Sequence, residues 1–401
     1  MDKSETRSQR LKRRIRIFTW TLAILLVGVG AVYLAAWLGK DYSTAARALV
    51  WGDSAVDDYT RFASRQIDAP AASFHYERGH GYPDGLPDTA VPGHPDLTVM
   101  LAANKTTAFI AIQDDRLIYE RYFNGYNRYA TETSFSISKS FNSAMLGRAI
   151  ADHRIGSIDD PITRYLPELL QHDPRFAQIT IRHLVSMSSG LRYVESGTPW
   201  GDDAKTYYAP DLRKLALQET EIVEPPGQRF HYNNFNPLLI GLILERATGK
   251  RVADYLAEVI WKPLGAEGAA TWSLDSTWSG FEKMESGINA RAIDFVKLGS
   301  LYLHRGAWRG KQVIPAEWVD QSTRYTNETD PALKYQYGWW TFHREGLGDY
   351  YAAIGNKGQY VFVFPQQRLV ILRQGIERGS IDWPKAISDI ALAVSGHGGQ
   401  H

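Results

Sequence analysis

Apolar residues form one long uninterrupted run near the start of the chain, from Ile17 to Leu38. These 22 residues carry no charge, lie between Arg16 and Lys40, and include tryptophan near both ends. About 20 apolar residues cross the hydrocarbon core of a bilayer as a helix, and tryptophan is enriched at its two interfaces. The pattern therefore predicts a transmembrane anchor over residues 17–38.

A basic tail precedes this run, because residues 1–16 hold seven lysines and arginines against two acidic residues. The positive-inside rule predicts that this tail is cytoplasmic and that the rest of the chain is periplasmic or extracellular. A cleaved signal peptide is the competing interpretation, but its apolar core is usually only about 7–15 residues long. The nearest Ala-x-Ala, which begins at Ala46, follows Lys40 and Asp41. We therefore expect the anchor to be retained.

Weak patterning marks the segment that follows the anchor. Residues 40–68 are typical of a short helical or irregular stalk. Eight of the seventeen residues from Gly79 to Pro95 are glycine or proline, which disfavours regular secondary structure there. The sequence therefore predicts a stalk and a loop over residues 39–100, ahead of a domain over residues 101–395.

Within residues 101–395 the patterns of strands and helices are clearer. Alternating apolar residues predict a β-hairpin over 107–123 and two strands at 359–364 and 368–374, in a strand-rich region that begins at Tyr335. Helical spacing predicts helices over 238–247 and 291–303 and a final amphipathic helix through Ile387 and Val394. It also predicts mostly helical structure over 151–224.

Composition narrows the possible functions. The 401 residues are 44% hydrophobic and 22% charged, enough for a large core and more than one average domain. The absence of cysteine excludes disulfides, thiolate ligands and a thiol nucleophile. The chain contains no His-Glu-x-x-His, Walker A or Gly-x-Ser-x-Gly pattern, which disfavours zinc peptidases, P-loop proteins and ordinary α/β-hydrolases. The basic run directly precedes an apolar segment, so nothing indicates nucleic-acid binding.

One serine stands out as a candidate nucleophile. Ser136 alone among the serines is followed by a lysine, Lys139, three positions later. Helical spacing of the apolar residues around it, with Thr131, Thr133 and Ser134 as possible N-caps, would put both side chains on one helix face. A serine beside a base is the arrangement of nucleophilic catalysis. The alternative is a serine-rich core helix with an incidental lysine.

A lysine base makes demands on its surroundings. An ordinary lysine, with a pKa of about 10.4, must lose more than 3 units to be neutral near pH 7, which corresponds to roughly 4–5 kcal/mol. A helix N-terminus supplies only about 0.3–1 kcal/mol of this. Such a lysine must therefore also be buried or share its proton with a second group.

Tyr232 and Asn234 are candidates for residues that lie beside Lys139. They lie between a Pro-Pro-Gly turn and a predicted helix that has Asn236 as N-cap and Gly249 past its end. A tight connection before a buried helix holds side chains rigidly. The Tyr-x-Asn pattern is common, however, and recurs at Tyr122 and Tyr325. The aromatic residues of 200–208 and of the Trp339-Trp340 pair could line a cleft, although core packing explains them equally well.

Taken together, these motifs resemble the penicillin-recognising, β-lactamase-like serine hydrolases, in their class C branch. The resemblance covers roughly residues 100–395. It rests on Phe135 to Lys139, on Pro226 to Asn234, and on supporting matches at Ser189-Gly190-Leu191 and at Leu301-Tyr302-Leu303 with Gly306. The Gly-x-x-Gly-Gln pattern of 355–359 and the Trp339-Trp340 pair are most similar to 6-aminohexanoate-dimer hydrolase-like and esterase-like members.

The third family motif departs from its usual form. Where β-lactamases and D,D-peptidases have Lys-Thr-Gly or His-x-Gly, this chain has Ala353-Ile354-Gly355, and Lys357-Gly358 is an alternative register. In those enzymes the missing side chains help to hold the substrate carboxylate. A β-lactamase or D,D-peptidase activity is therefore a weaker alternative.

The resemblance implies an α/β (α+β) fold with an antiparallel sheet flanked by helices, a mostly helical subdomain and the N-terminal transmembrane helix. It implies that Ser136 forms an acyl-enzyme, that Lys139 and Tyr232 share proton transfer, and that no metal or cofactor is needed. On the substrate side it implies roles for Asn234, Gly355, Asn356, Trp339 and Trp340, with backbone N–H groups of Ser136 and Asn356 at the oxyanion. We expect a small ester or amide as substrate; a non-catalytic binding module is the remaining alternative.

Overall fold

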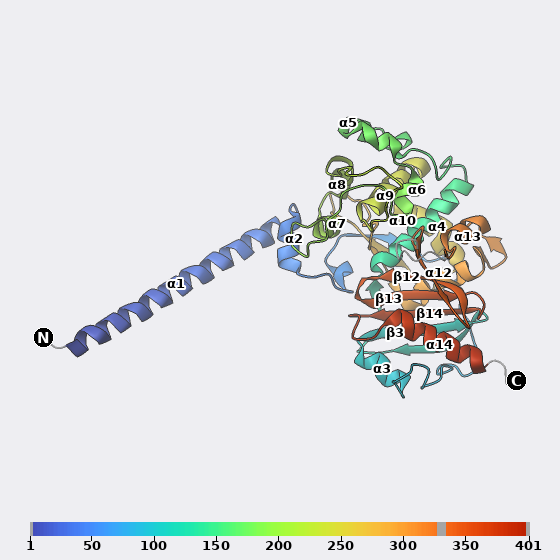
Figure 1. The fold of residues 1–401 in the computed structure, drawn as a ribbon, viewed down its shortest axis with the longest axis horizontal. Coiled ribbons are helices and arrows are strands. Elements are labelled where there is room, and N and C mark those ends of the chain that lie inside the picture. Colours follow the sequence, from blue (N-terminus) through green and yellow to red (C-terminus); the bar gives the residue numbers. More distant parts are fainter. Residues whose placement is uncertain (1–2, 327–333, 398–401) are drawn as a thin grey trace. The chain divides into compact units, whose positions relative to one another are not determined.

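The computed structural model describes residues 3–326 and 334–397 (Figure 1). The predicted domain over 101–395 thus includes a stretch, 327–333, that lies outside the described residues. Two compact units are present. One comprises residues up to Ser54 together with 195–210, and the other comprises 55–194 and the chain from Asp211 onward.

The first unit is built on helix α1, Lys3–Gly39. Among the described residues, α1 is the one helix long and apolar enough to cross a membrane, over Leu11–Gly39, and a signal sequence would show the same property. Helix α2, Thr44–Trp51, follows and packs against α7, Asp202–Tyr208. The Tyr208 hydroxyl donates to the Gly52 carbonyl at 2.6 Å. The aromatic loop of 200–208 is therefore part of this first unit.

The second unit contains an eight-stranded sheet in the order β10-β11-β12-β13-β14-β3-β4-β2, which is antiparallel except between β2 and β4 (Figure 1). The predicted hairpin and both strands near the C-terminus are confirmed, with ends within two residues of those expected. The strands are β2 Glu77–Arg78, β3 Thr106–Gln113, β4 Arg116–Tyr122, β10 Tyr335–Gln336, β11 Trp339–Arg344, β12 Gly348–Gly355, β13 Gln359–Phe364 and β14 Leu369–Gly375.

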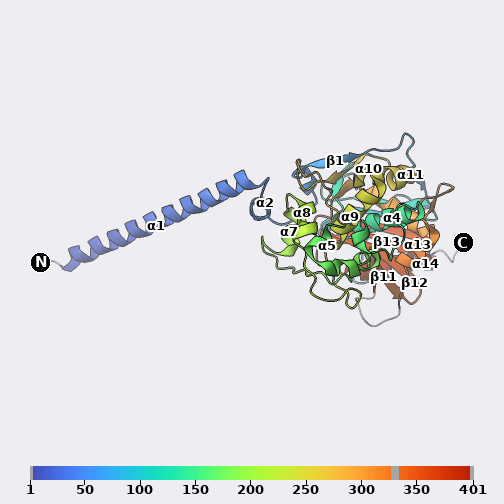
Figure 2. The ribbon, with the colours of Figure 1, turned by 90° about the horizontal axis from the view of Figure 1, so that it is seen from above.

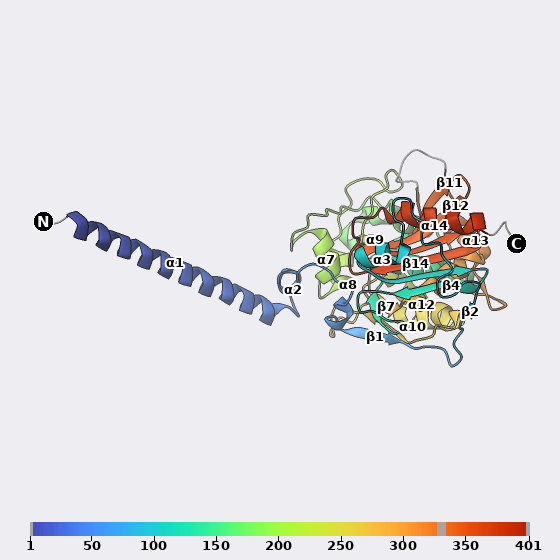
Figure 3. The ribbon, with the colours of Figure 1, turned by 90° about the horizontal axis from the view of Figure 1, so that it is seen from below.

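Helices cover both faces of this sheet, as the α/β prediction requires. On one face α3, Leu97–Ala103, and α14, Trp383–His397, share a hydrophobic core with β3, β13 and β14 (Figure 3). On the other face lies α12, Ala292–Leu303, which confirms the helix predicted over 291–303. At Gly299 a Cβ would meet the Val370 side chain at 2.5 Å, so glycine allows α12 to lie close to the sheet.

The remaining helices form the mostly helical part of this unit. α4, Ser138–Ala151, packs against α9, Phe235–Thr248, and α10, Val252–Leu256, and the three lie together in Figure 2. Burial on all sides is expected for α4, because its serines, alanines and glycine allow its neighbours to approach closely. The other helices are α5 Leu169–His172, α6 Ile181–Val185, α8 Leu212–Gln218, α11 Lys262–Leu264 and α13 Ala316–Ser322.

A second, four-stranded sheet shows that the predicted stalk is wrong beyond residue 54. Its order is β1-β6-β7-β5, and its strands are β1 Ser64–Ile67, β5 Thr131–Thr133, β6 Ala270–Ser273 and β7 Ile288–Arg291. Because β1 pairs with β6 and β2 pairs with β4, much of 55–100 is built into the second unit. These short strands depend on partners far away in the sequence, which local patterning does not reveal.

The caps predicted for two helices are also wrong. Thr131 and Thr133 lie in β5, and no side chain caps α4, which follows directly from a 3₁₀ turn over Phe135–Ile137. Helix α9 has its N-cap at Asn234, two residues before the predicted Asn236. The Asn236 side chain instead accepts a hydrogen bond from the Ser189 hydroxyl at 2.7 Å, so it links the helix to the segment before it.

Glu132, in β5, makes the stability of this unit depend on pH. It is 2% exposed and accepts a hydrogen bond from Thr107 Oγ1 at 3.0 Å. Burial raises the pKa of its carboxyl from 4.5 to about 7. The folded protein therefore holds a proton that the unfolded chain releases between pH 4.5 and about 7. The free energy of unfolding should fall as the pH rises through this window and level off above it.

Replacing Glu132 by glutamine is expected to remove this fall in the free energy of unfolding at high pH. At pH 8 the Glu132→Gln variant should unfold with a free energy higher by about 3 kcal/mol than wild type, with no gain at pH 4. Denaturant titrations at the two pH values measure the difference. Glu77→Gln, which changes an exposed glutamate paired with Arg116, is the matched control and should show no such gain. Equal stability of Glu132→Gln and wild type at pH 8 would contradict the prediction.

Candidate active site

The predicted nucleophile lies on a strained turn. Phe135, the residue before Ser136, has a φ of +47°, a conformation that is unfavourable for a large side chain. Phe135 is itself only 3% exposed, so packing around it stabilises the turn. Ser136 is partly exposed, whereas every residue from Ile137 to Gly147 is buried. The turn therefore presents one serine at the start of an otherwise buried helix.

Lys139 lies directly beside Ser136. Its Nζ is 2.9 Å from Ser136 Oγ and donates to the Glu285 carbonyl at 3.1 Å. The residue is 4% exposed. Because the helix places the two side chains on one face, the pair can exchange a proton without moving the backbone.

Tyr232 lies across from Lys139, in the connection that precedes α9. The Lys139 Nζ is 4.9 Å from the centroid of the Tyr232 ring. That ring is stacked on Trp340, with centroids 6.1 Å apart, and meets Tyr335 edge-on at 5.8 Å. Tyr335 is fully buried, and burial together with the nearby Tyr232 raises its pKa well above the ordinary value. The tyrosine beside the lysine is thus held by an aromatic wall from β10 and β11.

Asn234, two residues after Tyr232, contributes a buried side-chain acceptor. Its Nδ2 donates to the Tyr193 hydroxyl at 2.8 Å, which fixes the side-chain orientation. Its Oδ1 is buried and has no hydrogen-bond partner among residues 3–326 and 334–397. A buried polar atom is normally paired, so an orphan acceptor indicates a position that a ligand can satisfy.

Strand β12 brings Gly355 against the nucleophile turn, and Asn356 begins the turn that follows the strand. A Cβ on Gly355 would lie 2.6 Å from the Ser134 carbonyl oxygen and 3.3 Å from Phe135 Cβ. Glycine therefore permits the end of the strand to touch the residues that precede Ser136. The Asn356 side chain accepts a hydrogen bond from its neighbour Lys357 N at 2.8 Å.

The two tryptophans predicted to contact substrate lie in different environments. Trp340 is partly exposed and contacts Tyr232, whereas Trp339 is completely buried. The Trp339 ring packs on Tyr302, with centroids 4.3 Å apart, in the core of the unit. Adjacent residues of a strand point to opposite faces. The prediction that Trp339 contacts substrate is therefore wrong, because its side chain faces α12.

Sequence reasoning missed three groups that shape the site. The Tyr193 hydroxyl accepts a hydrogen bond from Asn234, and the Glu285 carbonyl accepts one from Lys139. The Tyr335 ring packs edge-on against Tyr232. Tyr193 follows closely after the Ser189-Gly190-Leu191 match, which is a usable signal. A backbone carbonyl such as that of Glu285 leaves no signal in the sequence, because any residue type supplies one.

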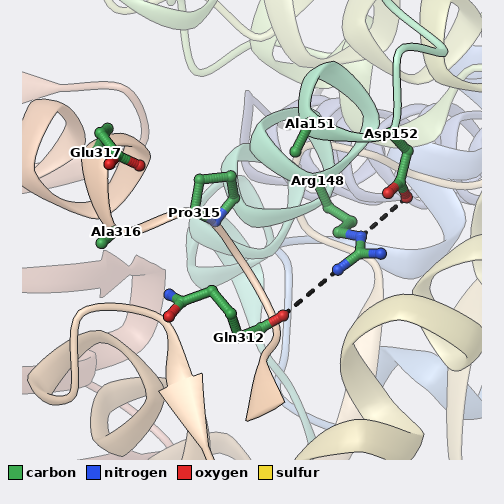
Figure 4. Close-up of a pocket in the computed structure, with 7 residues that line it drawn as sticks. All are labelled: Arg148, Ala151, Asp152, Gln312, Pro315, Ala316 and Glu317. Carbon is green, nitrogen blue, oxygen red and sulfur yellow. Dashed lines mark hydrogen bonds and ion pairs between the residues drawn. The ribbon is translucent and has the colours of Figure 1, made fainter.

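A separate cavity of about 450 Å³ lies at the far end of α4 (Figure 4). It is lined by Arg148, Ala151, Asp152, Gln312, Pro315, Ala316 and Glu317, and it contains none of the predicted site residues. Arg148 is twelve residues beyond Ser136, which corresponds to about 18 Å of helix. Its guanidinium is already paired with Asp152 at 2.8 Å, as Figure 4 shows. No group of three or more His, Asp or Glu side chains in the described ranges could hold a metal.

The sequence is similar to those of known proteins. The sequence model of the Beta-lactamase family matches residues 101–373. The chain is 26% identical over 306 residues to the 6-aminohexanoate-dimer hydrolase of Paenarthrobacter ureafaciens, which covers 70% of this chain and 74% of the relative. It is also 26% identical over 136 residues to a D-aminopeptidase of Brucella anthropi, covering 33% and 25% of the two chains.

Solved structures establish the fold. A Bacillus anthracis protein described as a candidate 6-aminohexanoate-dimer hydrolase superposes with a TM-score of 0.74 at 24% identity, covering 85% of this chain and 93% of that one. A penicillin binding protein from Bacillus halodurans superposes with a TM-score of 0.58 at 17% identity, covering 75% and 99%. The predicted mixed fold with helices flanking the sheet is confirmed.

Proposed function

Because the chain belongs to the Beta-lactamase family of serine hydrolases, we propose that it hydrolyses esters or amides through an acyl-enzyme formed on Ser136. One observation carries this proposal. The buried Lys139 places its Nζ 2.9 Å from Ser136 Oγ and 3.1 Å from the Glu285 carbonyl oxygen. A lysine amine within hydrogen-bond distance of a serine hydroxyl has the geometry that a general base needs.

The proposed reaction has two steps. Ser136 Oγ forms a bond to the carbonyl carbon while its proton passes to the Lys139 and Tyr232 pair, and the negative charge on the carbonyl oxygen is met by backbone N–H groups of Ser136 and Asn356. The tetrahedral intermediate then expels the alcohol or amine, which receives the proton. Water, deprotonated by the same pair, attacks the acyl carbon and releases the acid and free Ser136.

The substrate side favours an uncharged acyl group. Ala353, at the position of the family's lysine or histidine, is completely buried and offers no cation to a substrate carboxylate. The accessible wall is aromatic instead, with Trp340 stacked on Tyr232. The relative from Paenarthrobacter ureafaciens is named as a 6-aminohexanoate-dimer hydrolase, which fits the same proposal.

Turnover of p-nitrophenyl esters and of linear amides, measured beside nitrocefin, tests this proposal. We expect hydrolysis of the ester or amide that depends on Ser136, with nitrocefin turned over far more slowly. Fast nitrocefin turnover would instead establish the β-lactamase alternative. Stable acylation of Ser136 without release of the acid would favour a binding module.

We further propose that α1 anchors the protein in a bilayer, with residues 1–16 cytoplasmic and the second unit, called the hydrolase unit from here on, on the opposite side. The apolar window of α1 is only 6% buried within the protein, so a membrane would remove a large apolar surface from water. Carbonate washing of membranes should leave the full-length chain in the pellet. A variant that begins after residue 40 should be soluble. Full-length protein that is found soluble and shortened would identify a cleaved signal peptide instead.

A further inference from the structure

Arg373, in β14, is a cation buried in the core of the hydrolase unit. Its relative exposure is 0%, and its guanidinium stacks on the Trp383 ring, 4.2 Å from the centroid. Burial lowers the pKa of this guanidinium to about 10. An uncompensated buried charge is costly, so its partners indicate what it is there to hold.

Those partners are oxygens of the backbone and one hydroxyl. The Nη1 donates to the carbonyl of Gly358 at 2.7 Å and to that of Lys357 at 3.4 Å. The remaining bonds go to the carbonyls of Asn104 at 2.7 Å and Glu377 at 3.0 Å and to Thr106 Oγ1 at 3.2 Å. Among the ion pairs of the described residues, none joins Arg373 to a carboxylate. The cation thus gathers four carbonyls from three separate segments.

The turn that Arg373 holds follows directly on Asn356. Lys357 has a φ of +56° and Gly358 a φ of +83°, so two consecutive residues are in the left-handed region. A Cβ on Gly358 would lie 1.9 Å from Arg373 Nη1. The turn is therefore shaped around the guanidinium, and a lysine residue is kept in a conformation that it rarely adopts.

On its other side the same turn touches the nucleophile. Gly355, one residue before Asn356, is so close to Ser134 and Phe135 that a Cβ would overlap the Ser134 carbonyl oxygen at 2.6 Å. The backbone of 355–358 is thus packed between the nucleophile turn and Arg373. A shift of this backbone would move the N–H of Asn356 relative to Ser136.

We propose that Arg373 is a positioning residue that fixes the 356–358 turn, so that the Asn356 N–H meets the oxyanion formed at Ser136. This inference rests on the proposed function, since it assigns a task within the same reaction. Arg373 does not touch substrate. Its loss should therefore weaken transition-state stabilisation rather than substrate binding, which means a fall in kcat with little change in KM.

The test compares Arg373→Lys and Arg373→Met with wild type on a p-nitrophenyl ester. Removal of one oxyanion donor typically costs about 10²–10³ in kcat, and we expect a loss of about 10² for the methionine variant with KM within about threefold of wild type. Arg373→Lys keeps a charged hydrogen-bond donor, so its kcat should fall less than that of Arg373→Met. Arg368→Met is the matched control, because Arg368 precedes β14 and makes an exposed ion pair with Asp114. Its kcat should equal that of wild type.

A second variant perturbs the same turn without removing the guanidinium. Gly358→Ala puts a Cβ where Arg373 Nη1 lies 1.9 Å away, so the turn and the guanidinium must move apart, and kcat should fall in the same way. Combining it with Arg373→Lys should add little to the larger single effect, because both act on one turn. Full activity of a folded Arg373→Met or Gly358→Ala variant would overturn the inference.

A readout that does not need turnover separates this inference from the proposed function. Amide hydrogen exchange of the segment 355–359 should be faster in Arg373→Lys than in wild type and unchanged in Arg368→Met. Unchanged exchange in Arg373→Lys would overturn the positioning role, whatever the activity. If the Ser136→Ala variant hydrolysed the ester as fast as wild type, the proposed function would be refuted. The hydrogen-exchange result for Arg373→Lys would still be valid.

Discussion

Replacement of Ser136 by alanine is expected to lower kcat/KM for ester hydrolysis by about 10⁴- to 10⁶-fold. Ser136 Oγ is the atom that forms the covalent bond, and no other hydroxyl contacts Lys139 Nζ among its hydrogen-bond partners in the described chain. The variant should fold normally, because Ser136 is partly exposed and Lys139 keeps the Glu285 carbonyl. We expect a melting temperature within a few degrees of wild type.

Intact mass after exposure to a fluorophosphonate measures the same event directly. Wild-type protein should gain one adduct, and Ser136→Ala should gain none. Ser157→Ala, which changes a serine whose Oγ only accepts from Asp159 N at 3.1 Å, is the control and should be labelled like wild type. An adduct that persists in Ser136→Ala would place the nucleophile elsewhere. No adduct in wild type would make the binding module the leading interpretation.

The parts of the fold that the sequence predicts well are those stabilised by local interactions. The β3–β4 hairpin and α12 carry their own periodicity, and α9 ends at Gly249, whose φ of +70° only glycine adopts easily. The second sheet is different. β5 pairs with β7 across more than 150 residues, and strands of three or four residues are too short to show a period.

The candidate site shows the same division. Ser136 and Lys139 are three residues apart, so helix geometry alone brings them together. Tyr232, Gly355 and Trp340 reach them only through tertiary packing, and motif order rather than periodicity predicted their proximity. Trp339 shows the limit of motif reasoning, since strand alternation allows only one residue of an adjacent pair to face the site.

The second large effect concerns Lys139 and Tyr232, which we expect to act as one unit. Lys139 Nζ lies 4.9 Å from the centroid of the Tyr232 ring, and we propose that the two residues handle the same proton of Ser136. Lys139→Met and Tyr232→Phe should each lower kcat by about 10²–10⁴, the usual contribution of general acid–base catalysis. Methionine keeps the length and packing of the lysine, and phenylalanine keeps the ring stacked on Trp340.

The double variant distinguishes a shared role from two separate ones. If both residues handle the same proton, Lys139→Met with Tyr232→Phe should be about as slow as the slower single variant, because residues that act as a unit are strongly non-additive. Single-turnover acylation by a p-nitrophenyl ester measures the step in which Ser136 loses its proton. Lys262→Met and Tyr129→Phe, at exposed positions, are the matched controls. Losses that multiply in the double variant would contradict the shared proton and would assign the two residues to different steps.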